Sequence, residues 1–336
     1  MKIRLGLIGL GEPWAERHRR AILAMNDRFE IRAVCDGVHH RAELVAEELG
    51  ISATGGYSSL VKRPDIDAVI ITSSSWAGPL PILAACDAQK AIYCSHDIDL
   101  LPEEVQKIHK KVEKAGIAFS AELLRRNAPA TLRLKELIAT QLGKPQLLFC
   151  HHRLGADRNI HGSTIDPIRR ELVELLDWCC FIADQTPNFV TGIVHKRHEE
   201  TYPEEPIEDY HSLSLAFPQE GSSAPVAQVS CGRYIPTAWQ EAVSYRPLAS
   251  LQVSCERGVA FVDLPSSLVW FDEAGRHQES LDCELPIGER LFDQFYRSIT
   301  SLVRNRSDLE AIARAHEIIA RAEQSHEEGR RMEIFT

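Results

Sequence analysis

The sequence lacks the features that mark several large classes of protein. It has no low-complexity tract and no internal repeat, and no apolar run approaches the ~18 residues that a membrane span requires. The formal net charge of -10 leaves no basic excess of the kind that nucleic-acid-binding proteins carry. The first residues lead directly into an apolar strand, so we expect no signal peptide. We therefore expect a globular, cytoplasmic protein without a nucleic-acid or membrane partner.

The sequence also lacks the spacings typical of disulfide frameworks and metal sites. None of its nine cysteines stand as Cys-x-x-Cys, and several fall within apolar runs, which favours buried thiols. The pair His151-His152 and the cluster from His195 to Glu200 resemble metal ligands in composition only. Neighbours on a strand point to opposite faces, and the second cluster is interpreted as a charged loop before a Pro- and Glu-rich segment. We predict no metal site.

What the sequence does contain begins at its first residues. A short apolar strand, residues 3–8, runs into Gly9-Leu10-Gly11, and a second apolar run, residues 29–35, ends in Asp36. Glycines after a strand let the backbone approach a pyrophosphate, and a carboxylate some 20 residues later accepts hydrogen bonds from the adenosine ribose. This order predicts a dinucleotide-binding fold. A carboxylate at Asp36 favours NAD over NADP, although neighbouring His39, His40 and Arg41 soften that preference.

The apolar pattern divides the chain into two predicted domains. From residue 1 to 122, strands and helices alternate as βαβ units, which implies a parallel sheet of five strands in a Rossmann domain. From 123 to 336, apolar and polar residues alternate as in antiparallel strands, interrupted by one helix at about 167–182. The fold class is therefore α/β, an N-terminal Rossmann domain followed by an α+β domain with a large open, mainly antiparallel sheet.

Taken together, the motifs resemble the Gfo/Idh/MocA family, the glucose-fructose oxidoreductase and inositol dehydrogenase type of NAD(P)-dependent oxidoreductase. The match covers nearly the whole chain. It rests on residues 6–11 with His18, on Val34-Cys35-Asp36, on residues 65–71, on Arg126-Asn127-Ala128-Pro129, on Leu142-Gly143-Lys144-Pro145 and on residues 325–331. The resemblance implies hydride transfer on a sugar or polyol, with NAD as cofactor.

The resemblance also assigns candidate site residues. The cofactor-binding candidates are Gly9, Gly11, Glu12, Pro13, Trp14, Asp36, Ser73, Ser74, Ser75 and Ser95. The substrate-binding candidates, on segments that face the cleft in this family, are Arg126, Arg153, Asp166 and Arg170. An alternative interpretation of Arg169 and Arg170 is a solvated helix surface, because Glu171 and Glu174 lie at pairing distance along the same helix.

The chain departs from the family at the catalytic positions. Where the family carries Glu-Lys-Pro, with the lysine assisting proton transfer, this chain has Ser95-His96-Asp97, and Glu171 stands near the expected position of the helix histidine. Trp14 replaces the third glycine of the fingerprint. That exchange demands a wider gap between helix and strand, a shifted helix start, or an indole turned toward the ligand.

His96 and Glu171 form a candidate catalytic pair. Oxidation of an alcohol needs a base for the hydroxyl proton, and a histidine suits that role at neutral pH, with a carboxylate to orient its ring. The alternative is that His96 is a partly solvated loop residue.

Three functions therefore remain open. The first is an NAD-dependent oxidoreductase with an altered catalytic pair, and the second is an inactive dinucleotide-binding sensor or assembly subunit. The third is an enzyme that holds NAD tightly and uses transient oxidation for elimination or glycoside cleavage. The family implies a homodimer or homotetramer formed through the open sheet of the second domain.

Overall fold

The structure, a computed structural model, describes residues 2–73, 76–95, 102–155, 166–199, 202–219, 224–235, 239, 241–245, 249–282, 285–301 and 307–334. The chain divides into two compact units. Unit 1 comprises Met1–Leu123, Gly162–Ile165 and Leu285–Ala313, and unit 2 comprises Leu124–His161, Asp166–Glu284 and Arg314–Thr336. The N-terminal stretch of unit 1 ends one residue beyond the predicted boundary at 122, and the segment 285–313 returns to it from the far end of the sequence.

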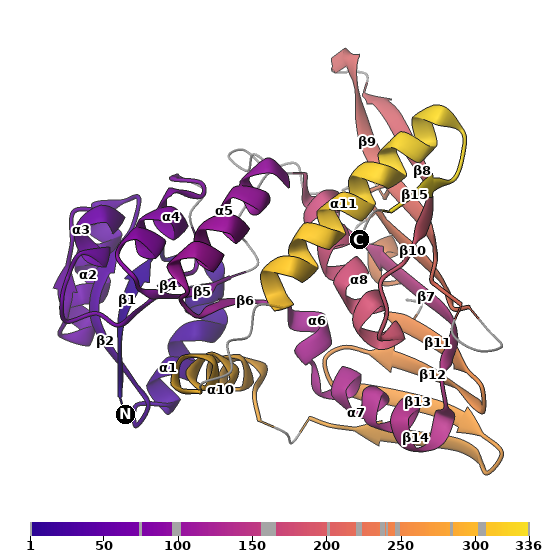
Figure 1. Cartoon of the computed structure of the whole chain (residues 1–336), viewed down its shortest axis with the longest axis horizontal. Coiled ribbons are helices and arrows are strands. Elements are labelled where there is room, and N and C mark those ends of the chain that lie inside the picture. The colour runs from indigo at the N-terminus through magenta and orange to yellow at the C-terminus, as the bar shows by residue number, and fades with distance from the viewer. Residues whose placement is uncertain are drawn as a thin grey trace. The chain divides into compact units, whose positions relative to one another are not determined.

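Unit 1 is built on a parallel sheet of six strands in the order β3-β2-β1-β4-β5-β6 (Figure 1). The strands are β1 (Ile3–Ile8), β2 (Phe29–Cys35), β3 (Ser52–Ala53), β4 (Ala68–Ile71), β5 (Ala91–Cys94) and β6 (Phe119–Ala121). Five strands were predicted here, and β1 and β2 have the predicted bounds. The sixth, β3, was not predicted because two residues carry no readable periodicity. The strand order reverses direction between β1 and β4, where dinucleotides bind in folds of this type.

Helices cover both faces of this sheet. They are the π-helical turn η1 (Trp14–His18), α1 (Arg19–Ala24), α2 (His39–Leu49), α3 (Tyr57–Val61), α4 (Leu80–Asp87), α5 (Pro102–Ala115) and α10 (Ile287–Thr300). Apolar side chains of α3, α4 and α5 pack with those of β4 and β5 in one buried cluster. On the opposite face, Tyr93 of β5 stacks on Phe292 of α10, with ring centroids 4.8 Å apart. Alternate residues of each buried strand therefore serve two apolar layers.

Unit 2 is built on a sheet of nine strands in the order β14-β13-β12-β11-β7-β10-β9-β8-β15 (Figure 1). The strands are β7 (Pro145–Arg153), β8 (Phe189–Glu199), β9 (Tyr202–Ala216), β10 (Val226–Gly232), β11 (Leu251–Cys255), β12 (Gly258–Asp263), β13 (Ser267–Asp272), β14 (Gly275–Ser280) and β15 (Met332–Glu333). Only β7 and β10 pair in parallel, so the sheet is mainly antiparallel, as predicted.

Helices accompany the sheet of unit 2. They are α6 (Leu124–Asn127), α7 (Pro129–Leu137), the π-helical turn η2 (Ile138–Leu142), α8 (Pro167–Ala183) and α9 (Glu241–Ser244), while α11 (Ser307–Glu328) begins in unit 1 and continues in unit 2. One buried cluster joins α7, α8 and α11 to the inward residues of the strands. The outward residues Leu147, Phe149, Ile193 and Phe271 stay exposed.

The prediction of a charged loop from His195 to Glu200 was wrong. Strand β8 continues to Glu199, and β9 begins at Tyr202, so most of this polar segment is the far end of a long antiparallel pair. Two shifts of register interrupt the pairing there. Polar residues can occupy such a hairpin end because neighbouring backbones, not buried side chains, supply its hydrogen bonds.

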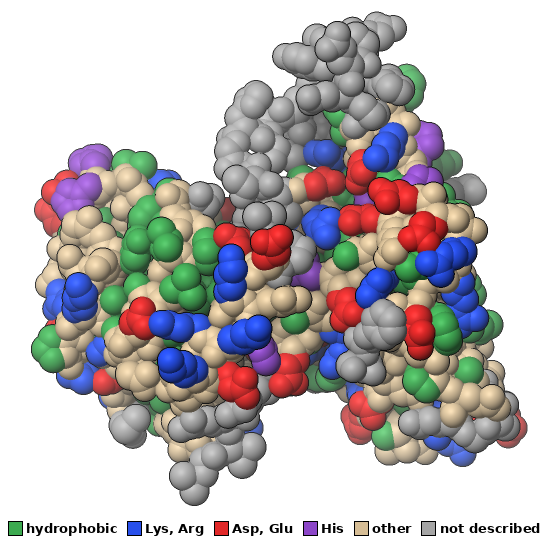
Figure 2. All heavy atoms as spheres, turned by 45° about the horizontal axis from the view of Figure 1, so that its top comes forward, with side chains coloured by type: hydrophobic (Ala, Val, Ile, Leu, Met, Phe, Trp, Pro, Cys, Tyr) green, Lys and Arg blue, Asp and Glu red, His purple; other side chains and the backbone are tan. Residues whose placement is uncertain are grey.

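Charges of both signs are interspersed on the surface seen in Figure 2, with no large field of one sign. Within the described residues, no helix is both long and apolar enough to cross a bilayer.

Candidate functional site

The loop after β1 is pressed against the loop after β4. Gly9 has φ +81°, and a Cβ on it would lie only 2.0 Å from the carbonyl oxygen of Ser73. A Cβ on Gly11 lies 3.0 Å from the Ser73 Cβ, and the Thr72 hydroxyl donates to the Gly9 carbonyl at 2.6 Å. Both glycines and Ser73 thus form the bare-backbone cradle that a pyrophosphate requires.

Asp36 ends β2 beside this cradle. Its carboxylate accepts the backbone N–H groups of Leu10 (2.8 Å) and Val38 (2.8 Å) and pairs with the Arg41 guanidinium at 2.9 Å. The Asp36 side chain is only 2% exposed. Asp36, predicted as a ribose ligand, therefore lies next to the glycine loop, and Arg41 neutralises part of its charge.

The chain passes from Gly11 into a π-helical turn instead of a regular α-helical one. Glu12 is exposed, whereas Pro13 and Trp14 are buried, and the turn η1 spans Trp14–His18. A π-turn is wider than an α-turn, so it accommodates the indole where the fingerprint expects a glycine. This π-helical turn was not among the three consequences predicted for Trp14. Pro13 has no N–H, so it offers no donor to an anion.

Trp76 packs beside Asp36, a position that was not predicted from the sequence. A Cβ on Gly37 would lie 2.8 Å from Cγ of the Trp76 indole, so the ring rests directly on the backbone that follows Asp36. The Tyr57 ring lies 5.8 Å from the indole. An aromatic residue directly after three serines was the only local signal, and its packing on Gly37 required the fold.

A buried carboxylate joins three elements at the carboxyl ends of β5 and β6. Glu122 accepts the Ser95 hydroxyl (2.9 Å) and Arg17 Nε (2.6 Å), and its Oε1 lies 3.2 Å from His18 Nε2. Burial raises the pKa of this carboxyl, but hydrogen bonds and charges from His18 and Arg17 lower it to about 2. Ser95 is thereby placed among buried polar groups. Glu122 was not predicted as a site residue, because nothing in its local sequence distinguishes it.

Three candidates cannot be placed. Ser74, Ser75 and His96 lie outside the described residues.

In unit 2, carboxylates of α8 form ion pairs with the arginines of the short helix α6. Glu171 pairs with the Arg125 guanidinium and lies 3.7 Å from His152 Nε2, while Asp177 pairs with Arg126 at 3.2 Å. The predicted orienting carboxylate Glu171 and the predicted substrate ligand Arg126 therefore already have charged partners inside this unit.

Between them on α8 stands Glu174, a buried acid that the sequence analysis did not select. Its carboxyl accepts the backbone N–H groups of Leu124 (3.2 Å) and Arg125 (3.4 Å) at the start of α6. Burial raises its pKa to about 8, assisted by the negative charges of Asp177 and Glu171 and opposed by Arg125. At neutral pH this carboxyl is therefore mostly protonated.

Of the remaining substrate candidates, Asp166 and Arg170 lie together, whereas Arg153 lies on another element. Asp166 is the N-cap of α8, where it accepts the Ile168 N–H at 3.1 Å and lies 3.7 Å from Arg233. The Arg170 N–H bonds to the Asp166 carbonyl, so these two share the first turn of α8. Arg153 ends β7, and its guanidinium donates to the Tyr245 carbonyl at 3.3 Å.

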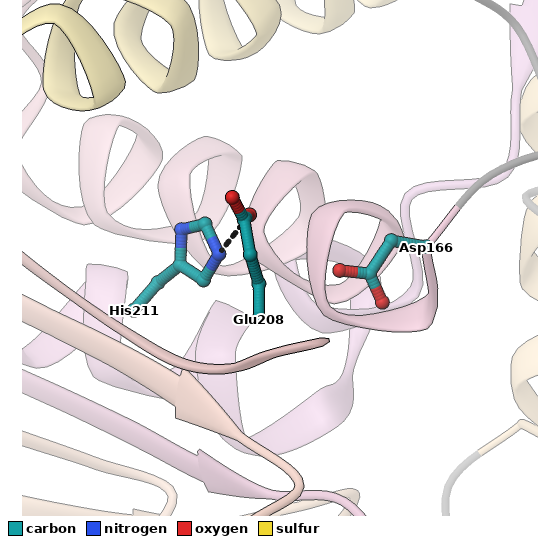
Figure 3. A group of neighbouring side chains, drawn as sticks. All are labelled: Asp166, Glu208 and His211. Carbon is teal, nitrogen blue, oxygen red and sulfur yellow. Dashed lines mark hydrogen bonds and ion pairs between the residues drawn. The ribbon is translucent and has the colours of Figure 1, made fainter. Parts of the chain in front are cut away.

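Asp166 also belongs to a polar cluster with Glu208 and His211 of β9 (Figure 3). One ligand atom of each lies within 4.8 Å of the others, and His211 Nε2 is 3.1 Å from Glu208 Oε2. Both carboxylates already face cations, Lys196 at 3.0 Å from Glu208 and Arg233 beside Asp166. These cations disfavour a metal ion and leave an array suited to hydrogen bonding with hydroxyl groups.

The histidines considered as metal ligands have other partners. His151 Nδ1 lies 2.7 Å from the Ser230 hydroxyl, His152 neighbours Glu171, and His195 Nδ1 lies 2.6 Å from Asp209. Cysteines in the described part of the chain are unpaired thiols, and seven of them are buried. Burial raises the pKa of Cys35 to about 12, as expected for an inert core thiol.

Comparison with known proteins agrees with this geometry. Residues 3–123 match the model of the Gfo/Idh/MocA oxidoreductase family, described as an oxidoreductase family with an NAD-binding Rossmann fold. An inositol 2-dehydrogenase of Acidothermus cellulolyticus is 28% identical over 207 residues, 60% of each chain. The scyllo-inositol 2-dehydrogenase (NAD(+)) of Bacillus subtilis is 31% identical over 147 residues, 43% of this chain and 42% of the relative. The matched segments thus span roughly half the length of these relatives.

Solved structures share the fold over the whole length. An NAD binding oxidoreductase from Klebsiella pneumoniae superposes with a TM-score of 0.78 at 18% identity, covering 100% of both chains. An oxidoreductase from Thermotoga maritima gives a TM-score of 0.79 at 18% identity, covering 99% of both. With the glycine cradle, Asp36 and the reversal of strand order in unit 1, these matches show that residues 3–123 form an NAD-binding Rossmann domain of the Gfo/Idh/MocA oxidoreductase type, and that the whole chain shares the fold of these structures.

Proposed function

We propose that this protein is an NAD-dependent dehydrogenase of a cyclic polyol, and that His96 replaces the family lysine as the base. The supporting observation is the cradle of Gly9 and Gly11 against Ser73 with Asp36 beside it, in a chain whose matched relatives are named inositol dehydrogenases. Bound there, NAD accepts a hydride from the carbon that carries the alcohol. The protein must then remove the hydroxyl proton, hold the ring and exclude water.

Each of these tasks has a candidate residue. His96 follows Ser95 in the sequence, and Ser95 lies at the end of β5, on the half of the sheet that faces nicotinamide in such folds. An imidazole can take the hydroxyl proton at neutral pH. Asp166, Glu208 and His211 offer acceptors to neighbouring hydroxyls, as a polyol requires. Arg153 and Arg170 are proposed as further donors to the substrate. Glu171, the carboxylate predicted to orient the base, is paired with Arg125.

The test is turnover of a panel of inositols with NAD, followed by NADH absorbance. We expect at least one inositol to be oxidised, and His96→Ala to lower kcat about 10²- to 10⁴-fold, the contribution of a general base. His109→Ala, a histidine of α5 in the same unit, is the control and should retain full activity. NADH binding without oxidation of any polyol would reject the proposal and favour the inactive sensor. Release of a glycosidic substituent without net NADH would favour the elimination enzyme.

We also propose that two copies of the chain associate through the outward face of the nine-stranded sheet. Leu147 and Phe149 of β7 are each 43% exposed there, and on the same face Phe261 and Phe271 make an edge-to-face contact at 6.1 Å. Exposed apolar side chains across a broad sheet match the self-complementary surface of a symmetric dimer.

Phe149→Glu is therefore expected to convert a dimer or tetramer into a smaller species, measured by light scattering. A charge placed in an apolar interface must be desolvated on both subunits, which disfavours association. Leu44→Glu, an equally exposed position on α2 of unit 1, should leave the mass unchanged. A wild-type monomer at working concentration would contradict the proposal.

A further inference from the structure

Glu122 is a fully buried carboxylate whose partners come from two other elements of unit 1. Its Oε2 accepts the Ser95 hydroxyl at the end of β5, and its Oε1 receives Arg17 Nε and lies beside His18 Nε2, both in the π-helical turn η1. Arg17 and Glu122 are 105 residues apart in the sequence. This one side chain thus links the helix that follows the glycine loop to the end of β5.

The location of Glu122 assigns it to one half of the cofactor. Parallel sheets of this order bind a dinucleotide as two mononucleotides, one on each side of the reversal between β1 and β4. Asp36 lies at the end of β2 and serves the adenosine half. The ends of β5 and β6, where Ser95 and Glu122 stand, belong to the nicotinamide half.

The cluster is poorly suited to a purely stabilising role. Buried ion pairs contribute little net stability, because desolvation offsets their attraction, whereas functional sites often retain them. Here Arg17 Nη2 and His18 Nδ1 are also buried without a hydrogen-bond partner among the described residues. A π-turn inserted in a helix is itself a feature found frequently at functional sites.

We propose that Glu122 is a positioning residue for the nicotinamide half of the site. Held by Arg17 and His18, its carboxylate fixes Ser95 and so the point from which the chain continues to His96. The inference rests on the proposed function for the role of His96, but its effect on nicotinamide binding can be measured without turnover.

The experiment compares NADH with ADP-ribose, which lacks the nicotinamide, by calorimetric titration. Glu122→Gln is expected to lower the affinity for NADH at least about 10-fold, as loss of a charge-assisted contact does. The affinity for ADP-ribose should stay within about 2-fold of the wild-type value. Ser95→Ala, which removes one hydroxyl with little structural risk, should weaken NADH in the same selective way. The exchange Ser95→Glu with Glu122→Ser is expected to restore NADH affinity relative to either single variant.

The matched control is Asp308→Asn. Asp308 is also buried in unit 1 and accepts the Ala121 N–H at 2.9 Å, one residue before Glu122. Asp308→Asn should lower the unfolding temperature and should change the affinities for NADH and ADP-ribose by the same factor. Equal weakening of both ligands by Glu122→Gln, in step with the unfolding temperature, would show a structural role only and overturn the inference. Selective weakening of NADH without oxidation of any inositol would uphold the inference while rejecting the proposed polyol activity.

Discussion

Gly9→Ala is expected to abolish measurable NADH binding and to destabilise unit 1. The added Cβ would lie 2.0 Å from the Ser73 carbonyl oxygen and 2.8 Å from the Ser73 nitrogen, so the two loops must separate. The positive φ of +81° adds strain that alanine does not tolerate. Together these effects should cost on the order of 3 kcal/mol or more, because the contacted atoms are backbone and cannot rotate away. Thermal unfolding and NADH titration measure both consequences.

Gly50→Ala is the control that distinguishes the strain of a positive φ from the steric clash of the added Cβ. Gly50 ends α2 in the same unit with φ +65°, and nothing lies within 4 Å of its Cβ position. This variant should lose only about 1 kcal/mol of stability and bind NADH normally. If Gly9→Ala behaved like Gly50→Ala, the close approach of the β1 and β4 loops would be refuted.

Glu174→Gln is expected to stabilise the protein at alkaline pH. The folded-state pKa of about 8 is raised above the ordinary value of 4.5 because burial penalises the charge. The folded state therefore binds more protons than the unfolded state between these values. The contribution of Glu174 is present in full below pH 4.5 and is lost as the pH rises through about 8. Glutamine keeps the shape and removes the ionisation, with an upper bound of roughly 5 kcal/mol above pH 8.

Unfolding midpoints of the wild type and Glu174→Gln should therefore coincide in mild acid and diverge by several degrees at alkaline pH. Glu279→Gln is the control of opposite sign. The Arg133 hydrogen bond lowers the pKa of Glu279, so its loss should destabilise the protein slightly at alkaline pH. A difference between the wild type and Glu174→Gln that does not vary with pH would mean that Glu174 is ionised in the folded protein throughout.

Most secondary structure followed from local pattern. Five of the six strands of unit 1 were predictable because each is a short apolar run next to helix start and stop residues, and α8 begins and ends within one residue of its predicted range. The failures were segments without such a pattern. β3 has two residues, and the end of β8 is polar, so only pairing with a neighbouring strand makes either one a strand.

The site was predictable only where one segment carries its own signal. The glycine loop and Asp36 could be found because spacing along the chain places them together. Glu122, Trp76 and Glu174 carry no such signal, since each becomes distinctive through contacts with residues distant in sequence. The partners of Glu171 and Arg126 were missed for the same reason.

By itself, the sequence determined the class of fold, the order of its two units and the place of the nucleotide loop, because apolar periodicity and glycine conformation act over a few residues. Tertiary structure alone decided the protonation of Glu174, the neutralisation of Asp36 by Arg41 and the coupling of Glu122 to Ser95. Electrostatic energies depend on burial and on the distance to the nearest charge, and both exist only once the chain has folded.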